Sequence, residues 1–121
     1  MKRGDGLVAR TKSFAFDCVE FSETLPGTYF GNHVKGQLIR CASSVAANYR
    51  ATRLAQTTAG FISKLSIVVE ESDECEFWLD LLLLFKFGND EKIKDLLKEA
   101  HELTSIFIAS RRTAQKNKAL S

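Results

Sequence analysis

The acidic run EESDECE, residues 70–76, is the densest group of side chains that could do chemistry. In a helix its members Glu70, Asp73 and Glu74 project to one side, because they are three and four residues apart. Clustered carboxylates can bind a hard cation, hold a proton, or pair with cations of a neighbouring helix. Bundle di-iron sites also need Glu-x-x-His pairs from two helices, and neither histidine of this chain has that spacing.

We interpret the run as a structural ion-pair network, because like charges at this spacing repel each other unless cations neutralise them. The carboxylates assigned to the network are Glu70, Glu71, Asp73 and Glu74. Partners could come from another copy of the chain or from the preceding helix, which offers Arg40, Arg50 and Arg53. A metal-dependent enzyme built on Glu70, Asp73 and Glu74 is the least favoured alternative.

A second group consists of cations that could hold phosphate groups, in two stretches of the chain. They are Lys35, Arg50 and Arg53 on one flank of the second predicted helix, and Arg111, Arg112, Lys116 and Lys118 near the C-terminus. Tyr49 could add a stacking platform for a base beside Arg50 and Arg53. Nucleic-acid binding requires several such charges to converge on one surface, and a solvated helix flank has the same pattern. The sequence leaves both interpretations open.

The three cysteines, Cys18, Cys41 and Cys75, are far apart and form no C-x-x-C pair, so neither a zinc site nor a disulfide framework is expected. Each falls on an apolar helical stripe, which predicts small core residues in a reducing compartment. The chain also contains no Gly-rich phosphate loop and no nucleophile elbow. We therefore expect no enzymatic activity, no cofactor and no bound metal.

Four amphipathic helices are predicted to position these residues, at roughly 10–25, 32–53, 58–87 and 91–116. Each has one apolar stripe that is expected to face the core. In chain order the stripes are Phe14, Cys18, Phe21 and Leu25; Val34, Leu38, Cys41, Val45 and Asn48; Phe61, Leu65, Val68, Ser72, Cys75, Leu79 and Leu82; and Ile93, Leu96, Leu97, Ala100, Leu103, Phe107 and Ser110. Their connections are short, which favours one domain over residues 1–121, an antiparallel up-down-up-down four-helix bundle. Helix ends are marked by Pro26-Gly27 after the first helix, Thr57 or Thr58 as cap of the third, Gly88 as its terminator and Asp90 as cap of the fourth.

The second half of the third helix, FWLDLLLLF at residues 77–85, is apolar on every side. A helix that is apolar all round must be covered all round. Either this helix is sunk more deeply in its own bundle, or a second copy of the chain covers it. We favour self-association. The residues assigned to that interface are Phe77, Trp78, Leu81, Leu84 and Phe85.

The stretch RCASSVAANYRA, residues 40–51, is rich in small side chains. Its rows of Ala and Ser would let a neighbouring helix come close, and we interpret it as a packing seam. Asn48 continues the core stripe, so its amide needs a partner, either a backbone carbonyl or an acidic side chain of the third helix. A buried Asn can fix the register of an assembly, so Asn48→Leu is expected to loosen its specificity.

Composition is that of an ordinary soluble domain, with 45% apolar and 26% charged residues. The net charge of +2 is too small to indicate a partner. Its distribution is uneven, since residues 1–54 carry eight Lys/Arg against four Asp/Glu, and residues 55–100 carry five against ten. Neither a signal peptide nor a membrane span is predicted, which favours a cytoplasmic protein that does not contact membranes.

Two dispersed stretches resemble the four-helix bundle proteins also called intervening-sequence or S23-type proteins. The first, QLIRCASSVAANYRAT, follows the family pattern at Gln37, Leu38, Arg40, Ser44, Val45, Ala47, Asn48, Tyr49 and Arg50. The second, FISKLSIVVEESDECEFWLDLL, follows it at Phe61, Ile62, Lys64, Leu65, Ile67, Glu71, Glu74, Trp78 and Leu79. Ala51 stands where Glu is usual, and Ala46 where many members have Gly.

The resemblance implies a non-enzymatic bundle that assembles as a ring-like homopentamer. Members of the family are encoded in intervening sequences of bacterial large-subunit ribosomal RNA genes and, more often, as free-standing genes. A relative, the accessory variability protein of diversity-generating retroelements, is a basic barrel that associates with nucleic acid and a reverse transcriptase. The expected function is thus an oligomeric scaffold that binds RNA or DNA, or alternatively a purely structural module or one that binds a protein partner.

Overall fold

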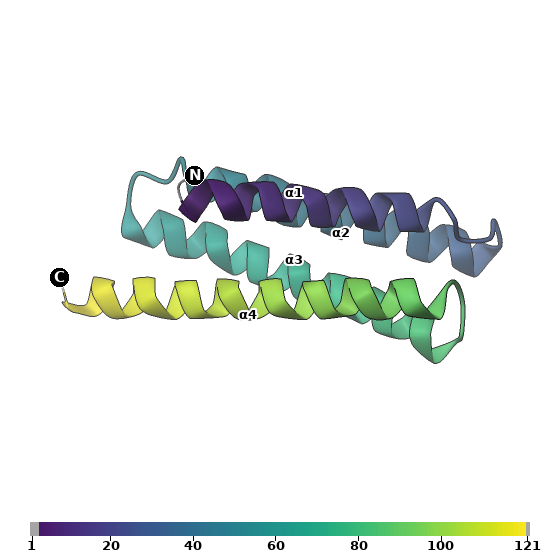
Figure 1. Cartoon of the computed structure of the whole chain (residues 1–121). Helices are drawn as coiled ribbons and strands as arrows, with labels where there is room; N and C mark the ends of the chain where they lie inside the picture. The colour runs from purple at the N-terminus through teal and green to yellow at the C-terminus, as the bar shows by residue number, and fades with distance from the viewer. Residues whose placement is uncertain (1–2, 121) are drawn as a thin grey trace.

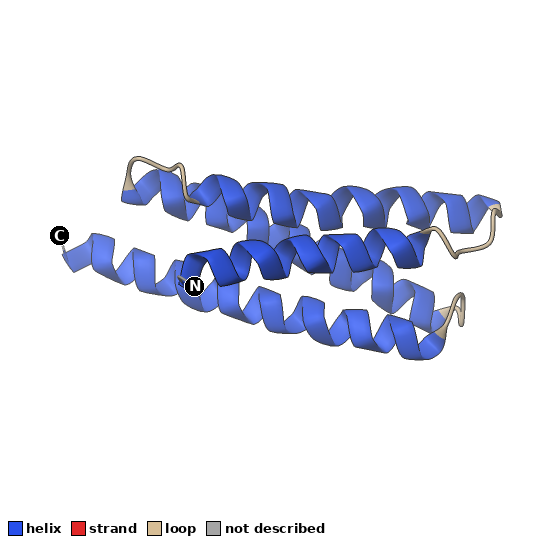
Figure 2. Cartoon of the chain, turned by 45° about the horizontal axis from the view of Figure 1, so that its top comes forward, coloured by secondary structure: helices blue, strands red, loops and turns tan. Residues whose placement is uncertain are grey.

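The four helices run antiparallel along one another and are joined by short loops (Figures 1 and 2). The computed structural model describes residues 3–120, with side chains from residue 6 onward, and contains no strand within that span. The helices are α1 (Arg3–Ser22), α2 (Tyr29–Thr52), α3 (Thr58–Leu84) and α4 (Asp90–Leu120). Consecutive helices pack closely, whereas α1 and α4 contact each other more sparsely. The predicted all-α four-helix bundle is confirmed.

The first helix begins at Arg3 instead of near residue 10, although glycines in its first turns disfavour a helix. Leu7 packs against the core and anchors these turns. The buried Thr11 hydroxyl lies 2.9 Å from the carbonyl oxygen of Leu7, one turn earlier. Tertiary packing therefore outweighs local propensity here.

Side-chain caps define the starts of the other three helices. Thr28 Oγ1 accepts from the Gly31 amide at 3.0 Å, and Thr57 Oγ1, as predicted, accepts from the Gly60 amide at 2.9 Å. The predicted cap of α4 is wrong by one residue, because Asn89 Oδ1 accepts from the Lys92 amide at 3.0 Å. Asp90 instead occupies the first turn of α4, where its charge favours the helix dipole.

The turn between α3 and α4 comes earlier than predicted. α3 ends at Leu84 and not at residue 87, because Lys86 already has a left-handed backbone with φ of 54°. The predicted terminator Gly88 is therefore wrong by two residues, because Lys86 closes the helix: its amide bonds to the Leu83 carbonyl oxygen and the Phe87 amide to that of Leu82. Gly88 has a positive φ of 103° within the turn that follows. A Cβ at Gly88 would also lie 3.1 Å from the Leu25 side chain, so this turn is packed against the loop between α1 and α2.

The predicted helical stripes form the core. Its fully buried large side chains come from all four helices and include Phe14, Leu38, Val45, Leu65, Leu79, Leu82, Ile93, Leu103 and Phe107. The predicted stripe members that are only partly buried are Asn48, Phe61, Leu97 and Ser110. The periodicity of apolar residues was thus sufficient to assign the inward face of each helix.

All three cysteines are fully buried, as expected of small core residues. Cys75 Sγ donates to Cys41 Sγ, 3.2 Å away across the α2–α3 contact. This hydrogen bond, together with burial, raises the pKa of the Cys75 thiol. Burial also raises the pKa of the Cys18 thiol. Both groups therefore stay protonated at neutral pH, and protonated thiols are poor nucleophiles.

A polar network fixes α3 against α4 within the otherwise apolar core. The buried Thr104 Oγ1 lies 2.9 Å from Ser72 Oγ and 3.0 Å from Glu76 Oε2. Glu76 Oε1 is 3.2 Å from His101 Nδ1, at the solvent edge of the same contact. Since each of these groups has a partner, the network can specify the register of the two helices at little cost in desolvation.

None of the helices, over the described residues, combines the length and the apolarity needed to cross a bilayer.

Candidate functional site

The second half of α3 presents a set of apolar side chains to solvent. Phe77, Leu84 and Phe85 are 55%, 74% and 61% exposed, whereas Trp78 and Leu81 are half-buried. The Trp78 ring stands edge-on to the ring of Phe77, with the centroids 5.0 Å apart. The chain itself therefore does not cover this surface, which we call the apolar face: Phe77, Trp78, Leu81, Leu84 and Phe85. The alternative of a helix sunk in its own bundle is excluded for the exposed members.

The acidic run is divided between two surfaces instead of forming one cluster. Arg40 of α2 pairs with Glu74 and, at 3.0 Å from Nη1, with Glu71. Hydrogen bonds from Arg40 and then from the Trp78 indole, 3.0 Å away, lower the pKa of Glu74. The predicted ion-pair network between α2 and α3 is thus confirmed for these two carboxylates.

The other two predicted members of the network, Glu70 and Asp73, are exposed on the outer side of α3. Glu70 and Asp73 therefore face solvent while Glu74 pairs with Arg40, so the three carboxylates are divided between two surfaces. Among the residues that the structure describes, no group of three His, Cys, Asp or Glu side chains is arranged to hold a metal ion.

Cations from all four helices gather at one end of the bundle. The antiparallel arrangement brings the starts of α1 and α3 beside the ends of α2 and α4 (Figure 1). We call this cluster the basic end: Lys12, Arg50, Arg53, Lys64, Arg111, Arg112, Lys116 and Lys118. Residues 6–12, 50–64 and 108–120 contain no carboxylate. By contrast, residues 71–104 carry ten Asp/Glu against four Lys. The bundle therefore has a positive net charge toward one end and a negative net charge toward the other.

Arg10 is close to the basic end but is already neutralised. Its Nη2 lies 2.6 Å from Glu99 and 3.2 Å from Glu102, both on α4. The hydrogen bond with Glu99 is the main reason why the pKa of Arg10 is raised. Arg10 therefore joins α1 to α4, the two helices that contact each other sparsely.

Two predicted nucleic-acid residues have other surroundings. Lys35 is near the start of α2, about 22 Å along the helix axis from Arg50 at 1.5 Å per residue, and so lies outside the basic end. The half-buried Tyr49 ring packs on Phe107, with centroids 5.5 Å apart, and burial raises the pKa of its phenol. One face of the Tyr49 ring is therefore occupied by the core. Arg50, Arg53, Arg111 and Arg112 do belong to the basic end.

Asn48 bonds within its own helix. Its Nδ2 donates to the Ser44 carbonyl oxygen at 3.0 Å and to Ser44 Oγ at 2.9 Å. The predicted backbone-carbonyl partner is confirmed, and the alternative of an acidic partner on the third helix is wrong. Because this bond crosses no helix contact within the chain, Asn48 does not set the register of the bundle.

The small-residue rows of α2 are only partly a seam within the chain. Ala42 is buried, but Ser43 and Ala47 are exposed. Together with Ala46 they line an outward hollow of about 320 Å³ between α1 and α2, flanked by Lys12 and Arg50. Within the single chain, the predicted close approach of a neighbouring helix is thus found at Ala42 and not at Ser43 or Ala47.

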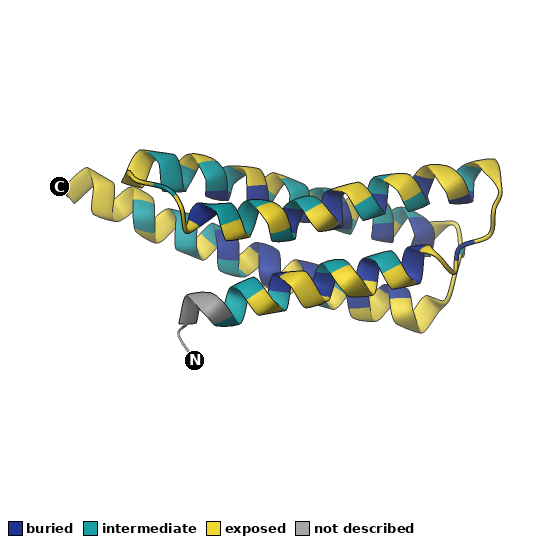
Figure 3. Ribbon diagram, turned by 90° about the horizontal axis from the view of Figure 1, so that it is seen from above, coloured by how far each residue is buried: buried dark blue, intermediate teal, exposed yellow. Residues whose placement is uncertain are grey.

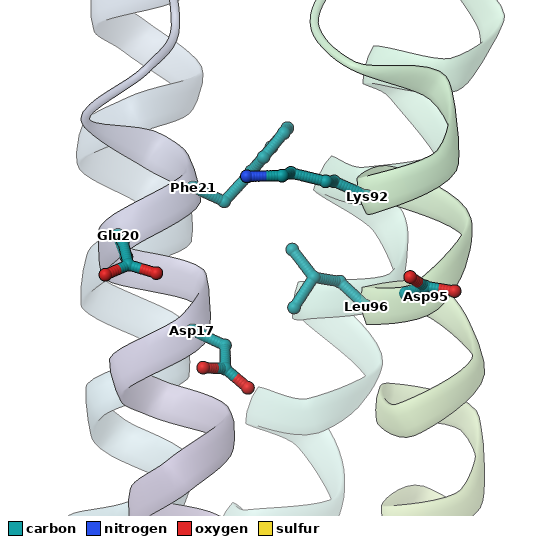
Figure 4. Close-up of a pocket in the computed structure, with 6 residues that line it drawn as sticks. All are labelled: Asp17, Glu20, Phe21, Lys92, Asp95 and Leu96. Carbon is teal, nitrogen blue, oxygen red and sulfur yellow. The ribbon is translucent and has the colours of Figure 1, made fainter.

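A hollow of about 200 Å³ lies between α1 and α4 (Figure 4). These two helices contact each other less than the other pairs of adjacent helices do. Its charged lining is Asp17 and Glu20 from α1 with Lys92 and Asp95 from α4. Figure 4 shows Lys92 extending from α4 toward Phe21 of α1. Because Lys92 offsets part of the acidic charge of this lining, we assign no function to this hollow.

Sequence reasoning missed two cations of the basic end, Lys12 and Lys64, and also missed the partial exposure of Phe61. The signal that could have found the two lysines is the topology itself, because an antiparallel bundle places the starts of odd helices beside the ends of even ones. Phe61 was assigned to the core stripe of α3. It is only half-buried and lines two surface hollows near the end of α4.

Comparison with known proteins gives matches for both sequence and fold. A family model described as 23S rRNA-intervening sequence protein matches residues 7–109. The chain is similar to a crystal structure from Bacteroides thetaiotaomicron, a protein of unknown function from the S23 ribosomal protein family. The two share 25% identity with a TM-score of 0.75, over 86% of this chain and 96% of that chain. No curated protein matches the chain.

Proposed function

The chain belongs to the 23S rRNA-intervening sequence protein family, and on this basis we propose that it is a non-enzymatic, self-associating four-helix scaffold whose basic end binds nucleic acid. The resemblance seen in its two sequence motifs is thereby confirmed at the level of the family. That family and its neighbour of unknown function assign no reaction or ligand, so the proposal rests on the surfaces of this chain.

The observation that carries the nucleic-acid proposal is the gathering of eight cations at one end of the bundle, on stretches without a carboxylate. Phosphate groups bind where several Lys and Arg side chains face one surface, since each contact releases condensed counterions. The acidic half of the bundle repels phosphate and would orient a strand toward the basic end. RNA and DNA share this backbone chemistry, so either could bind.

Binding is tested by fluorescence anisotropy with labelled oligonucleotides of mixed sequence, between about 50 and 200 mM salt. The test variant is the triple replacement Arg111→Gln, Arg112→Gln, Lys116→Gln. The control Lys86→Gln, Lys92→Gln, Lys98→Gln removes the same charge from outside the basic end. For single strands we expect the test variant to reduce the slope of log affinity against log salt by about 2, and the control to leave it unchanged.

Absence of binding by the wild type at the lowest salt would show that the nucleic-acid proposal is wrong. Equal losses in the two triple variants would show that the field of the whole protein, and not the basic end, holds the strand.

Self-association through the apolar face is the second part of the proposal. Soluble proteins seldom leave a contiguous group of large apolar side chains in water, and such groups mark interfaces. Here Phe77 and Leu84 of α3 and its C-cap residue Phe85 are all more than half exposed. The homopentamer implied by the family resemblance would cover this surface in each copy.

The alternative function is a module that binds a different protein through the same apolar face, without nucleic acid. It predicts a monomer in isolation, a partner recovered in a pull-down, and no effect of the basic-end replacements on partner binding.

A further inference from the structure

Two hollows of about 420 and 470 Å³ lie side by side at the basic end, where α4 projects beyond the loop between α2 and α3 (Figures 1 and 3). They share the side chains of Phe61, Ala114 and Asn117. Figure 3 shows that the residues in this projecting part of α4 are largely exposed. Exposed side chains line both hollows, including Gln56, Thr57, Thr113 and Asn117, so both are open to a ligand from solvent.

The lining of these hollows carries no charge, although cations surround it. Apart from Phe61 and aliphatic groups, its side chains are hydroxyls and amides, including Gln56, Thr57 and Asn117. The Gln56 and Asn117 amides, each with donor and acceptor atoms, make no hydrogen bond within the described part of the chain. An uncharged, hydrogen-bonding lining with one aromatic ring does not suit a phosphate group.

It does suit a nucleobase. A base presents a flat π-face that stacks on an aromatic ring, and an edge of donors and acceptors that pairs with amides. The cations that flank the hollows on α4, Arg111, Arg112 and Lys116, are placed to hold the phosphates on either side of such a base. In a duplex each base is stacked and paired, so only a single strand can deliver one into the hollow.

We propose that the Phe61 hollows form a subsite for an unstacked base of single-stranded nucleic acid, with Phe61 as the stacking surface and Asn117 contacting the base edge. This inference rests on the proposed nucleic-acid binding at the basic end and adds its preferred ligand class. It predicts that the protein binds single strands more tightly than duplexes of the same length and charge per strand.

The test uses the full chain, with single-stranded RNA, single-stranded DNA and a duplex, each carrying 2-aminopurine as a fluorescent base. The first variant, Phe61→Leu, keeps an apolar side chain but removes the aromatic face. Asn117→Ala is the second variant, because Phe61 also touches the core and its replacement could reduce stability. Phe16→Leu, an exposed phenylalanine on α1, is the matched control.

We expect the 2-aminopurine fluorescence to rise when a single strand binds, because the base leaves the stack of neighbouring bases that quenches it. Phe61→Leu should reduce this rise and weaken single-strand binding roughly 10-fold or more, the range found for base–aromatic stacking, with duplex binding unchanged. Asn117→Ala should weaken single-strand binding by a smaller factor at unchanged thermal stability, and Phe16→Leu should change nothing.

If the wild type binds single strands and duplexes equally, and neither Phe61→Leu nor Asn117→Ala alters binding, the base subsite is wrong while the proposed nucleic-acid binding stands. If no oligonucleotide binds at low salt, both are wrong.

Discussion

Replacement of Phe77 by Gln is the most informative test of the apolar face. Phe77 is 55% exposed in the single chain, so covering it in an assembly removes about 110 Å² from water, taking roughly 200 Å² for a whole aromatic side chain. At about 25 cal/mol per Å² this burial contributes about 2.7 kcal/mol per interface. Its loss corresponds to self-association weaker by about 100-fold, or somewhat less because the Gln stem stays partly apolar.

Sedimentation velocity over a concentration series measures this change directly. We expect the wild type to be assembled at micromolar concentration and the Phe77→Gln transition to move to much higher concentration, with an unchanged circular dichroism spectrum. Leu54→Gln is the control, because Leu54 is 79% exposed at the other end of the bundle. A wild type that stays monomeric, or a variant that assembles like the wild type, would refute the assignment of this face.

Three further predictions concern the fold. Thr104→Val removes a buried hydroxyl that joins α3 to α4 and should lower the free energy of unfolding in urea by about 1–2 kcal/mol, whereas the exposed Thr113→Val should change it little. Arg40→Met should cost about 0.5–1 kcal/mol at pH 7, because Arg40 is half exposed. Arg40 lowers the pKa of Glu74 in the folded state, so the ion pair stabilises the protein fully above the unfolded-state pKa of Glu74. This stabilisation is lost as the pH falls through the folded-state pKa of Glu74. A stability difference between wild type and Arg40→Met that persists at acid pH would contradict this assignment. The three buried thiols should react with a disulfide reagent such as DTNB only after unfolding; rapid reaction of the native protein would disprove their burial.

The helices could be predicted because their apolar stripes are long and regular. Each inward face followed from spacing alone, down to residues such as Leu65 and Phe107. The predicted helix boundaries were less accurate where tertiary contacts determine the end of a helix. Leu7, for example, packs against the core and holds the early turns of α1 in place. The turn after α3 was misplaced because Lys86, and not only Gly88, takes a left-handed backbone.

The candidate sites were predicted in part. The apolar composition of residues 77–85 indicated an exposed face because one helix cannot bury every side. Single-helix spacing could not show that Glu74 turns to Arg40 while Asp73 faces outward, since this depends on how α2 and α3 are rotated against each other. Likewise, Lys35 shares a flank with Arg50 in sequence, but the length of α2 separates them.

Lysine protection mapping tests the central claim, that the basic end binds nucleic acid, most directly. The protein is treated with an amine-reactive reagent with and without a saturating oligonucleotide, and modification is read by mass spectrometry. Protection is expected at the basic-end lysines Lys12, Lys64, Lys116 and Lys118, and not at Lys35, Lys86, Lys92, Lys94 and Lys98. Protection of the second group, or equal modification of every lysine with and without the strand, would contradict the account.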